Sequence, residues 1–262
     1  MRYAARTDIA RLTAVTVIGR RPTQAPMGTW SPFLVKRPGS WGLEIAMALA
    51  LVLWTIPLAW VSPLIDIDIW IRDFADANRP DWFDFLLVQT NKFGQGGLLG
   101  GIALGIAGII SYRRRTVRPL LAFLALYAMA GSVLVLKDVL PRVYPHWPGP
   151  AHPPYADATQ SLLFTTLEPA GAYPSGHVLN TIVWYGFLVF LLGGHLKTWQ
   201  RRLIRTFPPI IVAFSTTYLG FHWFTDCPAG LFIGVIILRV IQRIRWDTIE
   251  LPSWLEPEKR YL

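Results

Sequence analysis

Six long apolar runs, separated by short polar or basic segments, constrain the fold of this chain more than any other feature. A transmembrane helix needs about 20 mainly apolar residues in a row. The runs lie at about 41–64, 95–112, 119–137, 177–194, 207–221 and 227–240. Charged residues make up 16% of the chain, whereas soluble domains carry about 25%. The sequence therefore predicts an all-α, polytopic membrane protein, a bundle of six transmembrane helices.

The distribution of basic residues sets the expected orientation. With the N-terminus in the cytoplasm, that side holds 20 of the 25 Lys and Arg residues: seven in 1–40, four in 113–118, four in 197–205 and five from Arg239 onward. Because cytoplasmic segments carry an excess of Lys and Arg, both termini are predicted to be cytoplasmic. The membrane is the plasma membrane if the source is bacterial. The net charge of +9 then suits anionic phospholipids at the cytoplasmic face, and no nucleic-acid partner is expected.

The predicted organisation is one membrane domain at 41–241, a basic cytoplasmic tail at 1–40 and a cytoplasmic C-terminal tail at 242–262. The first forty residues lack a signal-peptide core; a membrane-surface segment and a mitochondrial-type presequence are the alternatives there. Six aspartates in 66–92 predict one or two interfacial helices on the outer surface, acting as a connector or as a lid. The proline-rich segment 138–175 predicts a long loop, functional or disordered.

Three short polar motifs lie at the edges of these runs, where ionisable residues are costly, and all fall on the predicted outer side: Lys137-Asp138-Val139-Leu140-Pro141-Arg142, Pro174-Ser175-Gly176-His177 and His222-Trp223-Phe224-Thr225-Asp226. The second motif opens an apolar helix, whose free N–H groups and dipole attract an anion. Ser175 adds a hydroxyl donor, Gly176 permits close backbone approach, and His177 can protonate a leaving group. The alternative is a plain serine cap followed by an interfacial histidine.

His222 and Asp226 stand four residues apart, a spacing that would place them on one face at a helix start. A carboxylate that fixes the imidazole tautomer would make His222 a nucleophile able to form a phosphohistidine; the alternative is a local pair that only satisfies two polar groups. Lys137, unless it is a simple membrane anchor, and Arg142 would bind phosphate. Because phosphoryl transfer needs mainly positioning and neutralisation of charge, the motifs together indicate attack on a phosphate ester at a membrane surface.

A zinc site built from His177, His222 and Asp226 is the competing chemistry. Lys137 and Arg142 on the same face would repel a cation, so neither a metal nor another cofactor is expected. The single cysteine, Cys227, excludes an internal disulfide and a cysteine-based metal cluster.

The three motifs together resemble the type 2 phosphatidic acid phosphatase family, the membrane branch of the superfamily that includes the vanadium haloperoxidases. The family pattern is Lys-x6-Arg-Pro, Pro-Ser-Gly-His and Ser-Arg-x5-His-x3-Asp. The resemblance covers about 119–240, and the matching residues are Lys137, Pro145, Pro174–His177, Ser215, His222 and Asp226. It implies a six-helix bundle with its site at the outer membrane face, with no metal. It also implies that His222 is the nucleophile, that Asp226 orients it, and that His177 is the leaving-group acid. Lys137, Ser175 and Gly176 would hold the phosphate.

Two positions depart from that pattern. Tyr144 and Thr216 stand where the first and third motifs have arginine. Arg142, two residues before Tyr144, is predicted to fill the first gap, and nothing near Thr216 fills the second. Losing a guanidinium contact to a transition state would cost roughly 10²-fold or more in rate.

The predicted function is hydrolysis of a membrane lipid phosphate through a phosphohistidine. Polyprenyl (di)phosphate, phosphatidic acid and phosphatidylglycerol phosphate are the candidate substrates. The alternatives are a lipid phosphotransferase that uses the same intermediate and a catalytically weak protein that binds lipid phosphates. The oligomeric state is left open.

Overall fold

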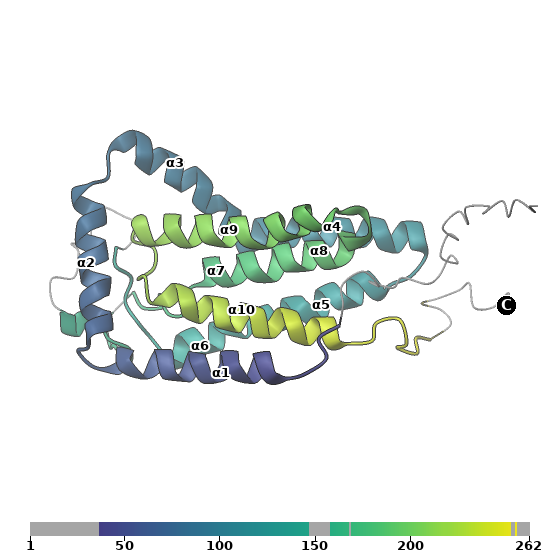
Figure 1. The fold of residues 1–262 in the computed structure, drawn as a ribbon, viewed down its shortest axis with the longest axis horizontal. Helices are drawn as coiled ribbons and strands as arrows, with labels where there is room; N and C mark the ends of the chain where they lie inside the picture. Colours follow the sequence, from purple (N-terminus) through teal and green to yellow (C-terminus); the bar gives the residue numbers. More distant parts are fainter. Residues whose placement is uncertain (1–36, 147–157, 168, 253–254, 256–262) are drawn as a thin grey trace, which may run out of the picture.

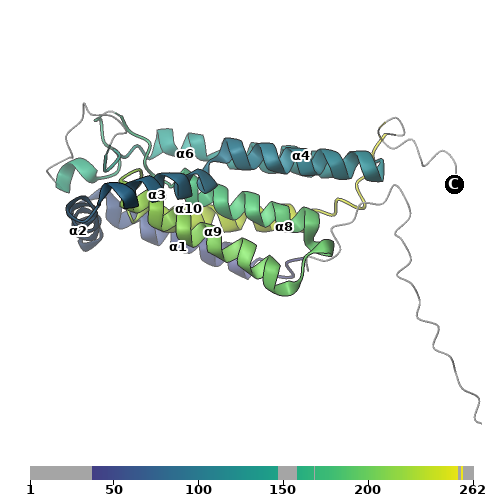
Figure 2. The ribbon, with the colours of Figure 1, turned by 90° about the horizontal axis from the view of Figure 1, so that it is seen from above.

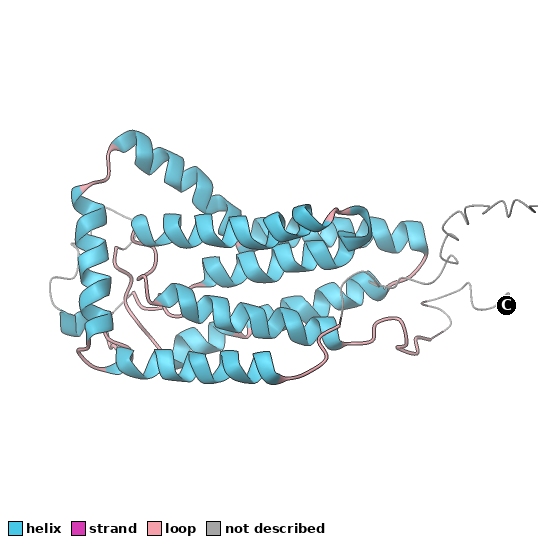
Figure 3. Ribbon diagram, in the orientation of Figure 1, coloured by secondary structure: helices cyan, strands magenta, loops and turns pink. Residues whose placement is uncertain are grey.

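A computed structural model describes residues 37–146, 158–167, 169–252 and 255, and every regular element among them is a helix (Figure 3). The helices of the long bundle include α1 (Gly42–Thr55), α4 (Gly96–Arg114), α5 (Arg118–Gly131), α9 (Thr198–Tyr218) and α10 (Asp226–Arg243). The other α-helices are α2 (Pro63–Ala77), α3 (Asp81–Asn91), α6 (Val133–Val139), α7 (Gly176–Asn180) and α8 (Gly186–Leu192). Single turns are η1 (Ile56–Ala59), η2 (Lys92–Gly94), η3 (Ala158–Ser161) and η5 (Gly193–His195); η4 (Thr181–Tyr185) is a π-helical turn joining α7 to α8.

Four of the six predicted spans are long and apolar enough to cross a bilayer in the described part of the chain: Gly42–Ala59, Gly96–Arg114, Arg118–Val139 and Gly176–His195. The first three expose leucine side chains to their surroundings, as expected of surfaces that face lipid. The fourth, Gly176–His195, is mostly buried inside the bundle. The fifth and sixth spans form helices, α9 and α10, which stay predictions as membrane spans. Each carries three charged side chains: Arg201, Arg202 and Arg205 in α9, and Asp226, Arg239 and Arg243 in α10.

The two ends of the bundle differ in composition (Figure 1). The last residues of α4, the start of α9 and the last residues of α10 lie at one end, and these carry the basic clusters of the described residues. The opposite end is crossed by α2, from which α3 returns toward α9, and the view from above shows the same arrangement (Figure 2). One or two helices were predicted within 66–92, and two are found, α2 and α3. Their place at the outer membrane surface stays a prediction.

Close packing between α10 and α7 positions the third motif against the second. Gly230 and Gly234 form a Gly-x-x-x-Gly stripe on α10, a pattern that lets membrane helices approach closely. A Cβ at Gly230 would overlap the Ser175 carbonyl, and one at Gly234 would lie 2.9 Å from Ile182 Cβ. Glycine at these positions therefore brings the start of α10 next to the start of α7.

Charged contacts attach α1 and the C-terminal segment to the bundle. Glu44 of α1 is buried and pairs with Arg243 (2.6 Å) and Arg239 (3.1 Å) of α10. After α10, Trp246 is buried, and Arg118 donates to the carbonyls of Trp246 and Ile249. The start of the predicted tail at 242–262 is thus packed against the bundle. The predicted tail at 1–40 lies outside the described residues except for 37–40.

Candidate active site

The three polar motifs meet at the end of the bundle that α2 crosses (Figure 1). Lys137 lies in the last turn of α6, Ser175 caps α7, and Asp226 is the first residue of α10. The Ser175 N–H donates to the Asp226 carbonyl at 3.0 Å. The chain after α6 is fixed by the N–H groups of Gly171 and Ala172, which donate to the Arg142 carbonyl. Segments far apart in sequence are thus locked together by backbone hydrogen bonds.

His222 is held in one tautomer by the backbone. It is 4% exposed, and its Nδ1 lies 2.7 Å from the Ala172 carbonyl oxygen. A carbonyl can only accept, so Nδ1 carries the proton and Nε2 keeps its lone pair. Nε2 lies 3.4 Å from Nδ1 of His177. The lone pair of His222 therefore points toward the other histidine of the motifs, His177.

Asp226 supports His222 differently from the predicted shared helix face. Residues 222–225 form a turn and α10 begins only at Asp226, because the carboxylate Oδ2 accepts the Trp223 N–H at 2.8 Å. The same Oδ2 lies 3.6 Å from His222 Nδ1, longer than a hydrogen bond, while Oδ1 accepts from Arg142 Nη1 at 2.7 Å. Asp226 therefore fixes the turn that carries His222 and places a negative charge beside the ring.

A pocket of about 490 Å³ opens at the two histidines. Its lining residues come from α3, α6, α7, the residue before α4, the segment after α6 and the turn before α10: Asn91, Gln95, Lys137, Tyr144, Gly176, His177, Asn180, Phe221 and His222. The Lys137 ammonium donates to the Gly171 carbonyl. Lys137 is the one Lys or Arg among these described lining residues. Burial raises the pKa of the Tyr144 phenol, so at neutral pH it is a hydroxyl able to donate.

Two residues predicted to bind phosphate lie outside this lining. The Ser175 side chain is fully buried and accepts the Val178 N–H at 3.3 Å, as a helix cap does. Arg142 is also fully buried, and its guanidinium donates to the Ser161 carbonyl, Thr225 Oγ1 and two carboxylates. Arg142 therefore does not fill the gap at Tyr144. Moving the guanidinium into the pocket would leave two buried carboxylates without their ion-pair partner, which is energetically costly.

Thr216, which stands where the third motif of the family pattern has arginine, also supplies no positive charge to the pocket. Thr216 is fully buried, and its Oγ1 has no hydrogen-bond partner in the structure. Its carbonyl accepts the N–H groups of Phe221 and His222. Thr216 thus supports the backbone under His222 and supplies no group to the pocket.

Sequence reasoning missed three carboxamides of the pocket, Asn91, Gln95 and Asn180. A Cβ at Gly96 would lie 2.6 Å from Asn180 Nδ2, so glycine lets the start of α4 approach α7. Ser215 Oγ donates to Asn91 Oδ1 at 3.4 Å, which connects the serine of the third motif to this wall. The only sequence signal was the glycine-rich corner at 94–97, which marks close approach of backbone.

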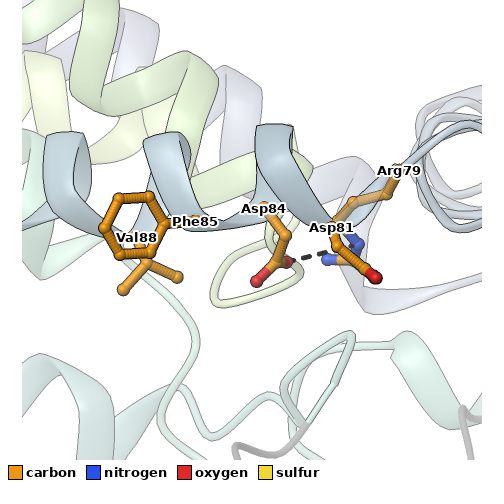
Figure 4. Close-up of a pocket in the computed structure, with 5 residues that line it drawn as sticks. All are labelled: Arg79, Asp81, Asp84, Phe85 and Val88. Carbon is orange, nitrogen blue, oxygen red and sulfur yellow. Dashed lines mark ion pairs between the residues drawn. The ribbon is translucent and has the colours of Figure 1, made fainter.

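A second hollow, of about 590 Å³, lies on α3 and is lined by Arg79, Asp81, Asp84, Phe85 and Val88 (Figure 4). Its arginine is already paired, with Asp76 at 2.7 Å and Asp84 at 3.7 Å. None of the predicted site residues lines it, so the histidine pocket is the better candidate site.

The zinc alternative finds no ligand set in the described residues, where no three His, Cys, Asp or Glu side chains gather as metal ligands. Asp226 is occupied by Arg142 and the Trp223 N–H, and Lys137 lines the same pocket as the histidines. The chemistry that this donor set favours is capture of an anion beside an uncharged imidazole.

We expect the His222 ring to titrate below pH 6.5, the ordinary value for histidine. Burial has the largest effect and lowers the pKa of the His222 imidazole; Lys137 acts in the same direction, and Asp226 opposes them. The neutral ring therefore predominates at neutral pH. The titration can be followed by the Cε1 resonance of histidine-labelled protein, assigned among five histidines by its loss in His222→Ala. A midpoint at or above 6.5 would show that the charge of Asp226 outweighs burial.

Comparison with known proteins places this geometry in a family. The PAP2 superfamily profile matches residues 118–250, half of the chain, including all three motifs. The chain belongs to the PAP2 superfamily. The resemblance read from the motifs is therefore confirmed at the level of the family.

Two individual comparisons agree with this PAP2 assignment. Phosphatidylglycerophosphatase B of Bacillus subtilis is 22% identical over 169 residues, which cover 63% of this chain and 76% of that protein. The crystal structure of a transmembrane PAP2-type phosphatidylglycerolphosphate phosphatase from Bacillus subtilis superposes with a TM-score of 0.64 at 19% identity. That match covers 81% of this chain and all of the other. The chain is thus an all-helical integral membrane protein with the fold of a transmembrane PAP2 protein.

Proposed function

We propose that this PAP2 protein hydrolyses the phosphate of a membrane lipid through a covalent intermediate on His222. The observation that carries the proposal is the pairing of His222 Nε2 with His177 Nδ1 at 3.4 Å in a pocket that also holds Lys137. A nucleophile, an acid and a cation on one pocket are the groups that phosphoryl transfer needs.

In the first step the Nε2 lone pair of His222 attacks phosphorus. A P–N bond forms while the P–O bond to the lipid alcohol breaks, and the electron pair of that bond stays on oxygen. His177, which takes up a proton when the negatively charged phosphate binds beside it, gives this proton to the oxygen, so the lipid leaves as an alcohol. The ring of His222, now phosphorylated with Nδ1 still protonated, is positively charged and is stabilised by the carboxylate of Asp226.

In the second step water replaces His222 on phosphorus. His177, neutral after the first step, takes a proton from water as the P–O bond forms and the P–N bond breaks. His222 recovers its lone pair and inorganic phosphate is released. The Ala172 carbonyl holds the His222 ring in the same tautomer throughout.

The phosphate itself would be held by Lys137 and by the start of α7. Lys137 neutralises charge on the equatorial oxygens. Gly176 is the first helical residue, and the first N–H groups of a helix have no acceptor within it. We assign the Tyr144 hydroxyl a third contact, in place of the arginine of the family pattern. The phosphate-binding roles predicted for Arg142 and for the Ser175 hydroxyl are not retained, because both groups are buried away from the pocket.

The relatives suggest which substrate to test first. Both are named for action on phosphatidylglycerol phosphate, so we propose this lipid ahead of phosphatidic acid and polyprenyl (di)phosphates. We also propose that the site faces the outer side of the membrane, as the predicted six spans require. The segregation of basic clusters to the opposite end of the bundle supports this orientation.

We expect purified protein in detergent to release phosphate from at least one of these lipids in the presence of EDTA. The rate should be the same with EDTA as with added Mg²⁺ or Zn²⁺, since the proposed chemistry uses histidines and a lysine. Phosphate release should be measured together with the lipid products, with and without added alcohols. Loss of activity in EDTA would revive a metal mechanism, and phosphorylated alcohol without free phosphate would make the protein a transferase.

A further inference from the structure

A buried carboxylate on α2 reaches the catalytic end of α10. Asp68 is fully buried, although α2 lies outside both the long bundle and the matched residues 118–250. Its Oδ1 accepts the Thr225 N–H at 2.9 Å, and its Oδ2 accepts from Thr225 Oγ1 at 2.5 Å. Asp68 thus holds the residue immediately before Asp226 by both its backbone and its side chain.

Asp68 also shares a guanidinium with Asp226. Arg142 Nη2 lies 2.7 Å from Asp68 Oδ2, and Arg142 Nη1 lies 2.7 Å from Asp226 Oδ1. Arg142, Asp68, Asp226 and Thr225 are all fully buried. Arg142 is therefore a bridge between two carboxylates, one on α2 and one on α10.

The charges in this network add up differently with and without Asp68. Arg142 alone would cancel the charge of Asp226, and the His222 ring 3.6 Å away would then face a neutral pair. Burial raises the pKa of the Asp68 carboxyl, and Arg142 and Thr225 oppose that rise. When Asp68 is ionised, two carboxylates share one guanidinium and a net negative charge remains beside His222.

We propose that Asp68 is a positioning residue for this active site, which keeps Asp226 negatively charged toward His222 by engaging Arg142 and fixes Thr225 at the start of α10. The inference rests on the proposed role of His222 as nucleophile. It gives the extramembrane helix α2 a part in catalysis instead of a role as a connector.

The test is Asp68→Asn, which keeps the size of the side chain and removes its charge. We expect kcat to fall about 10- to 100-fold, less than the loss seen when an orienting carboxylate itself is removed. We also expect the His222 titration to move to lower pH, because a negative charge that favours the protonated ring is lost. The charged and titratable groups that face His222 are Asp226 of α10, His177 of α7, Lys137 of α6 and Tyr144, and none of them changes. The matched control is Asp66→Asn, on the same helix but exposed, which should leave both quantities unchanged.

A second variant separates charge from folding. Asp68→Asn combined with Arg142→Gln removes one charge of each sign and leaves the charge of Asp226 unopposed. The His222 titration should then return close to its wild-type midpoint. If Asp68→Asn does not fold, Arg142→Gln alone is compared with the double variant, and loss of the Asp68 charge should again lower the midpoint.

Two results would overturn the inference. One is a kcat within about twofold of wild type, too small for a lost electrostatic contact. The other is a fall in kcat without a change in the titration midpoint of His222, whether Asp68→Asn is made in the wild type or in Arg142→Gln. That result would indicate a structural role only. Neither result contradicts the proposed function as long as the His222→Ala variant is inactive. If His222→Ala is active, it is the proposed function that fails.

Discussion

Replacing His222 with alanine will lower kcat by at least about 10⁴-fold on every lipid phosphate that the wild type hydrolyses, because loss of a nucleophile removes the covalent route entirely. In the structure no other described group of the pocket combines a free lone pair with an orienting partner: His222 Nδ1 is bound to the Ala172 carbonyl, which leaves Nε2 available. The variant should still bind substrate, since Lys137 and Gly176 remain. A separation of kcat from KM is therefore expected.

Two measurements check this result. Steady-state phosphate release gives the loss in kcat, and rapid quenching with radiolabelled substrate should trap phosphoenzyme in the wild type alone. Phosphohistidine survives base and is lost in acid, which identifies the residue type. His195→Ala is the matched control, because His195 is exposed in η5 at the opposite end of the bundle. A His222→Ala variant that keeps more than about a hundredth of the wild-type rate would show that His222 is no nucleophile.

The membrane architecture was largely predictable because apolar length is a local property. The four helices long and apolar enough to cross a bilayer are continuous apolar runs, and their ends agree with the predicted ranges to within a few residues at most helix ends. The fifth span was predicted at about 207–221, and the helix that contains most of it, α9, begins nine residues earlier, at Thr198. Its first turns are basic and Pro208 and Pro209 lie inside the helix. Prolines are tolerated in helices of membrane proteins because neighbouring groups satisfy the freed carbonyls.

The residues of the candidate site could be predicted only where they belong to one of the three sequence motifs. His177, His222 and Lys137 lie on one pocket as the resemblance implied, because their spacing from the helix starts is part of the motif. Asp68 could not be found in this way. It is one of six aspartates in 66–92, and nothing in the spacing separates it from exposed Asp66; only burial against Thr225 and Arg142 does. The prediction that Arg142 reaches the phosphate was wrong for the same reason: its guanidinium is bound to Asp68, a buried partner on α2 that the sequence does not reveal.

Lys137→Met is the second large effect that we expect, with a fall in kcat/KM of about 10³-fold. Removing a single hydrogen-bond donor to developing charge typically costs about 10²- to 10³-fold. The upper end applies here because Lys137 is the one Lys or Arg among the described lining residues, whereas the family pattern adds two arginines at Tyr144 and Thr216. Methionine keeps the length and the apolar stem of lysine, so packing at the end of α6 is preserved.

The loss should be visible in both kcat and KM, since a phosphate is charged in the ground state as well as in the transition state. Lys92→Met is the control: Lys92 is exposed, and its ammonium bonds to the Gln89 side chain at 2.6 Å. Tyr144→Arg introduced into Lys137→Met should recover part of the rate, because Tyr144 lines the same pocket at the position of the family arginine.

Full activity of Lys137→Met would mean that the phosphate binds elsewhere. Failure of Tyr144→Arg to help would mean that residue 144 cannot reach it. Partial recovery would establish that the pocket binds phosphate through positive charge, which can be supplied either from α6 or from residue 144.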